Sequence, residues 1–110
     1  MGPADAHRDH RATSLLTYDA WLQSGKSFAL YYYEVLTGEQ SHNFYPTDYV
    51  DITSTKSRKD NATMAHASQQ PEWIHKHHDQ MDRFRGLECG SEFAEAFVRQ
   101  MQSRPAEWPA

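Results

Sequence analysis

The spacing of apolar side chains between residues 71 and 85 predicts a helix. At about 100° per residue, one stripe of this helix is apolar and the opposite side carries histidine and aspartate. The apolar stripe contains Trp73, Ile74, His77, Met81 and Phe84. Pro71 suits the first turn, where its missing N–H costs nothing, and Gly86 is expected to end the helix.

A second apolar stripe predicts another helix over residues 91–103. Ser91 is placed to cap its start, and Pro105 follows its end. The stripe contains Phe93, Ala94, Phe97, Val98 and Met101. We therefore expect residues 71–85 and 91–103 to form a helical pair with their apolar stripes packed against each other.

Residues 28–36 are the most apolar run of the chain and fit two structures. As a helix they place their aromatic side chains on one face; as a strand they turn at Gly38 and pair with residues 41–45. Three consecutive tyrosines lose rotamer freedom in a helix, so we favour the strand. A second β-favouring run at residues 49–53 then gives a small antiparallel sheet within residues 27–54.

The predicted fold is α+β. The sheet is covered by a short helix at residues 18–24, capped by Thr17, and by the helical pair. An all-α fold, in which residues 27–37 are helical, is the alternative. The chain is expected to divide into a flexible N-terminal tail (1–13), a single domain (14–104) and a C-terminal tail (105–110).

Composition narrows the possible functions. The formal net charge is −4, which argues against nucleic-acid binding, although residues 54–60 are expected to form a basic surface loop. Cys89 is the only cysteine, and no apolar run reaches the roughly 18 residues of a membrane span. We therefore expect a cytoplasmic protein with no membrane segment.

The polar side of the helix at residues 71–85 carries candidate metal ligands. His75, His78, Asp79 and Asp82 are three or four residues apart, so their side chains can converge. Two imidazoles and carboxylates suit a divalent transition metal such as zinc, with a metal-bound water as the nucleophile of a hydrolase. The spacing matches no known metal motif, and a solvated polar face with local His–Asp pairs is the favoured explanation.

Aromatic side chains suggest a second kind of site. The candidate partner-binding residues are Tyr31, Tyr32, Tyr33, Phe44 and Tyr45. Tyrosine is enriched in protein interfaces, and so little apolar material is present that both faces of a tyrosine strand cannot be covered. Trp108, between two prolines, fits either a frayed tail or a short docking segment. No catalytic constellation is complete.

From these residues we expect a small protein–protein interaction or regulatory module rather than an enzyme. Its partner would be another protein or a second copy of the chain, as a homo-oligomer. A metal-binding protein or metal-dependent hydrolase that uses the histidine-aspartate face is the alternative.

Overall fold

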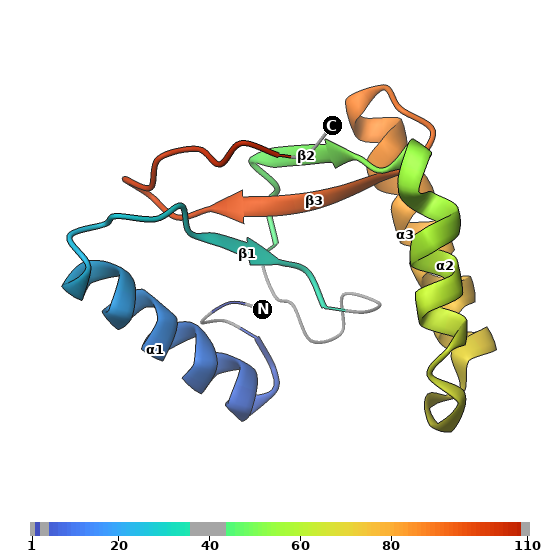
Figure 1. Ribbon diagram of the computed structural model, residues 1–110, viewed down its shortest axis with the longest axis horizontal. Helices are drawn as coiled ribbons and strands as arrows, with labels where there is room; N and C mark the ends of the chain where they lie inside the picture. The colour runs from blue at the N-terminus through green and yellow to red at the C-terminus, as the bar shows by residue number, and fades with distance from the viewer. Residues whose placement is uncertain (1, 3–4, 36–43, 109–110) are drawn as a thin grey trace. The chain divides into compact units, whose positions relative to one another are not determined.

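The computed structural model describes residues 2, 5–35 and 44–108, and it confirms the α+β fold (Figure 1). Among the described residues a three-stranded antiparallel sheet has the order β1-β3-β2. The elements are α1 (Arg8–Gln23), β1 (Tyr31–Tyr33), β2 (Asp48–Asp51), η2 (Thr53–Thr55), α2 (Lys56–Met64), η3 (Ala67–Gln69), α3 (Pro71–Cys89) and β3 (Ala94–Arg99).

The strand interpretation of the tyrosine run is confirmed, but its partner along the chain differs. β1 pairs antiparallel with β3, with Tyr31 opposite Arg99 and Tyr33 opposite Phe97. The expected partner, residues 41–45, lies mostly outside the described residues. The second predicted strand is present as β2. Just outside its ends, the Thr47 amide donates to the Phe97 carbonyl of β3 and the Ile52 amide donates to the carbonyl of Phe93, the residue before β3.

The predicted helix at residues 91–103 is wrong, because its middle part, Ala94–Arg99, is the central strand β3. The spacing of its small and aromatic side chains fits a helix and a strand equally well. Pairing with a neighbouring strand on each edge makes this segment a strand. Ser91 does not cap a helix, since its hydroxyl donates to the Phe93 carbonyl at 3.2 Å. Met101, expected in the core, is 80% exposed.

Helix α1 begins ten residues before the expected start at Tyr18. Thr17 does not cap it; its hydroxyl donates to the Thr13 carbonyl one turn earlier, at 2.8 Å. The cap is His7, whose Nδ1 accepts from the Asp9 amide. The last residues of the expected N-terminal tail are therefore the first turns of α1.

Residues 54–60 are not the expected surface loop. Helix α2 starts at Lys56, whose side chain is buried with its ammonium 4.9 Å from the centre of the Phe93 ring. The aliphatic part of a lysine side chain can pack on apolar surface while its ammonium reaches a polar partner. Here the partners of the ammonium are carboxylates. The basic run is thus helical, and its first lysine points inward.

Helix α3 starts at Pro71 as predicted but ends at Gly90 instead of Gly86. Gly90 has φ +82°, the left-handed conformation that favours glycine after a helix. The predicted orientation of the helix is also wrong. Trp73 and Phe84, expected in the core, are 49% and 55% exposed, whereas Asp82 on the expected solvent face is buried.

Gly86 gives a testable consequence of how α3 packs. A Cβ at this position would lie 2.6 Å from the Glu92 carbonyl oxygen and 2.7 Å from that of Ser91. Although alanine favours a helix, we expect Gly86→Ala to lower the free energy of unfolding by about 1–3 kcal/mol through overpacking. Urea denaturation measures it, with Gln80→Ala on the exposed side of α3 as the control. Equal or greater stability of Gly86→Ala would contradict this packing.

By their internal contacts the residues form two compact units, one of residues 1–48 and 96–110, the other of residues 49–95. Trp21 is the most deeply buried large side chain of the first unit, and its indole N–H donates to the Phe28 carbonyl at 2.9 Å.

None of the helices in the described part of the chain is long and apolar enough to cross a membrane.

Candidate protein-binding surface

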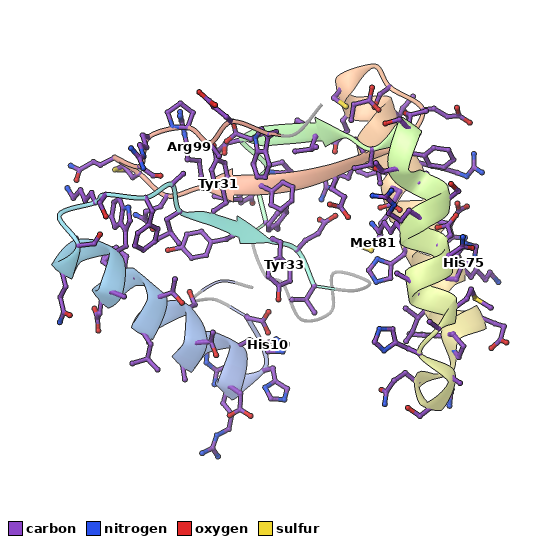
Figure 2. The ribbon with its side chains drawn as sticks, viewed as in Figure 1. His10, Tyr31, Tyr33, His75, Met81 and Arg99 are labelled. Atoms are coloured by element: carbon purple, nitrogen blue, oxygen red, sulfur yellow. The ribbon has the colours of Figure 1, made fainter. Side chains whose placement is uncertain are left out.

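One face of the β1–β3 pair carries aromatic side chains. Side chains alternate along a strand, and directly opposite residues of an antiparallel pair share a face. The register therefore places Tyr31, Tyr33, Phe97 and Arg99 on the same face. Figure 2 labels Tyr31, Tyr33 and Arg99. We call these four residues the aromatic face.

Trp108 lies on the aromatic face and completes a cluster of rings. Its ring stacks on Phe97 with centroids 5.0 Å apart and an interplanar angle of 27°, and it meets Tyr31 edge-on at 5.0 Å. Tyr31 and Phe97 also meet edge-on, at 6.3 Å. These separations are in the range where aromatic pairs attract one another beyond simple burial.

The turn after β3 brings the chain back toward the sheet (Figure 1). The Gln100 amide donates to the Leu30 carbonyl at 3.0 Å, and the Leu30 amide donates to the Ser103 hydroxyl at 2.9 Å. Gln102 takes the left-handed conformation within this turn, at φ +71°. Ser103 is buried, and its hydroxyl accepts a hydrogen bond from Leu30, the residue before β1. The residues after Ser103 therefore leave the turn from a fixed position.

Residues 104–108, which we call the C-terminal segment, are held by backbone contacts as well as by Trp108. The Ala106 amide donates to the Tyr31 hydroxyl at 2.9 Å. The Arg104 guanidinium donates to the Ser27 carbonyl. These contacts hold the described residues 104–108 against the sheet.

The predicted partner-binding residues are divided by the structure. Tyr31 and Tyr33 are on the aromatic face, whereas Tyr32 points to the other face, where its hydroxyl donates to the Gln100 amide oxygen at 2.6 Å. Burial raises the pKa of Tyr32. Phe44 is half-buried and Tyr45 is 75% exposed, while Tyr33 is 49% exposed.

Phe97 and Trp108 belong to this surface and were not among the predicted site residues. Phe97 was assigned to a helical core stripe because its spacing fits one. Trp108 could have been recognised from its position between Pro105 and Pro109, since prolines restrict the chain and prepare a segment for docking.

The Tyr31 hydroxyl can be tested as the anchor of the C-terminal segment. In Tyr31→Phe the ring remains but the Ala106 amide loses its acceptor, which removes a hydrogen bond of about 1 kcal/mol. We expect hydrogen exchange at Ala106 to become about fivefold faster, as measured by NMR. Tyr33→Phe on the same face should leave this rate unchanged. An unaltered rate in Tyr31→Phe would show that the hydroxyl does not hold the segment.

Three of the four predicted metal ligands, His75, Asp79 and Asp82, lie in a network of ion pairs that joins α2, α3 and β3. The Lys56 ammonium is 2.5 Å from Asp60 and 3.1 Å from Asp79. The Lys59 ammonium bridges Asp82 at 2.8 Å and Glu95 at 2.7 Å. The two predicted metal-binding carboxylates, Asp79 and Asp82, therefore form ion pairs with lysine ammonium groups.

The contacts of this network shift the pKa values of its carboxyl groups. Hydrogen bonds from Arg83 and Lys56 hold the pKa of Asp79 below its usual value, despite burial. Burial would raise the pKa of Asp60, but its hydrogen bonds with Lys56 and His75 outweigh burial and lower it. Burial raises the pKa of Asp82, and this effect outweighs the hydrogen bond from Lys59 and the nearby Lys56 ammonium, both of which lower it.

His75 and His78 are both half-buried on α3. The His75 Nε2 lies 3.4 Å from Asp60, so its nearest acidic partner comes from α2 (Figure 2 labels His75). In the described parts of the chain, no three His, Cys, Asp or Glu side chains are grouped so that they could hold a metal ion. The metal site therefore stays a prediction from sequence spacing.

Comparison of the chain with known protein families, with curated proteins and with solved structures found no significant match.

Proposed function

We propose that this protein is a small protein–protein interaction module, with a regulatory role, that binds its partner through the aromatic face. The observation that carries the proposal is the gathering of Tyr31, Phe97 and Trp108 on one side of the β1–β3 pair. On the same side Tyr33 leaves 49% of its surface exposed. The partner is another protein or a second copy of the chain.

The physical support is that such a face binds at low entropic cost. Tyrosine and tryptophan offer a large contact area and a polar group while losing few rotamers. The Tyr31 ring meets Phe97 of the neighbouring strand edge-on, so a partner meets an ordered pair of rings on the sheet. Arg99 adds a cation at its edge, a residue type enriched in interfaces.

A peptide-display selection against the immobilised full chain tests the proposal. Enriched peptides are synthesised, and their affinities are measured by fluorescence polarisation. We expect Tyr33→Ala to weaken binding by about 10-fold or more, since truncated aromatic hot spots cost at least 1–2 kcal/mol. Trp73→Ala is the matched control, because Trp73 is also 49% exposed but belongs to the other compact unit.

Sedimentation of the wild type and of Tyr33→Ala at increasing concentration tests a second copy as the partner. Peptides or dimers whose affinity depends on Tyr33 and not on Trp73 support the proposal. A chain that enriches no peptide and stays monomeric, or one whose ligands are indifferent to Tyr33, would contradict it.

A further inference from the structure

The C-terminal segment lies on the aromatic face in the manner of a bound peptide. Its backbone amide at Ala106 donates to a side chain of the sheet, the Tyr31 hydroxyl, and its one aromatic side chain stacks on Phe97. The Arg104 side chain reaches a backbone carbonyl of the same compact unit. The segment thus contributes one amide, one ring and one cation to the contact.

The sequence of the segment suits such a ligand. Pro105 fixes its own φ and disfavours helix at Arg104, which reduces the entropy lost on docking. Because proline has no N–H, the first amide donor after Arg104 is that of Ala106, and this donor meets Tyr31. Trp108 follows Pro105 at the third position and reaches the ring pair.

The contacts are those of an occupant that can be displaced. Trp108 remains 40% exposed, although its ring touches two others. A segment tethered to its own site acts at an effective concentration of the order of millimolar, so modest contacts suffice to hold it. A partner with the same pattern, and with further contacts of its own, can therefore replace it.

Resting on the proposed function, we propose that the aromatic face recognises peptides with the pattern Pro-x-x-Trp, and that residues 104–108 are a built-in competitor for that site. The segment covers Tyr31 and Phe97 until a partner with this pattern takes its place. The ligand class is thus an extended, proline-led tryptophan peptide of another protein. In this arrangement the C-terminal segment sets the threshold concentration for binding.

The test uses a labelled synthetic peptide with the sequence of residues 104–110, titrated into the full chain by fluorescence polarisation. Trp108→Ala removes the ring of the competitor and should bind the added peptide about 10-fold more tightly than the wild type does. Ala106→Pro removes the competing amide donor and should act in the same direction. Circular dichroism checks that both variants are folded, and Trp73→Ala should bind as the wild type does.

The specificity of the site is tested in the Trp108→Ala background. A peptide with alanine in place of tryptophan should bind at least 10-fold more weakly. Adding Tyr31→Phe should lower the affinity for the original peptide about fivefold, which corresponds to one lost hydrogen bond. Both losses are expected because they remove the contacts seen at Phe97 and Tyr31.

Two results would overturn this inference. One is equal affinity of the wild type, Trp108→Ala and Ala106→Pro for the peptide; the other is no binding by any of them at peptide concentrations of several millimolar. If display-selected peptides still bind through Tyr33 without competing with the synthetic peptide, the interaction function stands and only the ligand class is wrong. If no peptide of either kind binds and the chain stays monomeric, both proposals fail.

Discussion

Lys56→Met is expected to lower the free energy of unfolding by about 3–5 kcal/mol at neutral pH. Lys56 is 5% exposed, and its ammonium lies within 4 Å of carboxylates of Asp60, Asp79 and Asp82. Methionine keeps the length and apolar stem of the side chain but removes the charge. The carboxylates then face one another with less compensation in a partly buried site, and urea denaturation measures the loss.

The loss should depend on pH. Asp60 and Asp79 have pKa values below the usual 3.8, so their stabilising effect is present above that pH and is lost as the pH falls through the folded-state values. Asp82 has a raised pKa, so its ionisation opposes folding near neutrality and this cost is relieved by acid. The difference between wild type and Lys56→Met should therefore shrink below about pH 4.

Lys76→Met is the control for this experiment. Lys76 is exposed on α3, so its substitution should change stability by no more than about 0.5 kcal/mol. A Lys56→Met deficit below about 1 kcal/mol, or one that is the same in acid as at neutral pH, would show that the network does not hold α2 and α3 together.

Trp21→Ala should destabilise the other compact unit by about 3–5 kcal/mol, the range for a large aromatic side chain removed from a core. The Trp21 side chain is 1% exposed, with Tyr18 beside it and the Lys26 ammonium 5.5 Å from its ring centre. Truncation also leaves the Phe28 carbonyl without its indole donor. Thermal unfolding followed by circular dichroism measures the change.

Trp73→Ala is the matched substitution at an exposed tryptophan. Its expected cost is about half that of Trp21→Ala, because 49% of Trp73 is already in water. If the two tryptophan substitutions had equal effects, Trp21 would not be the centre of its core.

The fold class and two of the three strands could be predicted from local chemistry. The three tyrosines disfavour a helix, and the run before residue 54 alternates as a strand does. Pro71 marks the start of α3 because only a first turn accepts it without loss. These features depend on a few neighbouring residues, so the sequence alone contains them.

Other features depend on distant partners and could not be read from local patterns. The stripe around Phe97 fits the helical period, and only pairing with β1 and β2 makes it a strand. Likewise, a periodic pattern on α3 cannot reveal that Lys56 and Lys59 come from another helix to pair with Asp79 and Asp82. A helix face with aspartates was therefore expected in water, although Asp82 is buried.

The candidate surface was predicted in part for the same reason. Tyrosine composition indicated β1, but strand alternation separates Tyr32 from its neighbours. Phe97 joins the surface only through the β1–β3 register, and Trp108 only through the turn that Ser103 ties to Leu30. Long-range pairing thus selects which aromatic residues form one face.

The central claim is that the C-terminal segment lies on the aromatic face, and NMR of the full chain tests it most directly. We expect nuclear Overhauser contacts between the indole protons of Trp108 and the ring protons of both Phe97 and Tyr31, since these rings are 5.0 Å apart by their centres. The contacts should persist on dilution, because the segment and the face belong to one chain. A Trp108 indole with random-coil chemical shifts and no contact to either ring would contradict the claim.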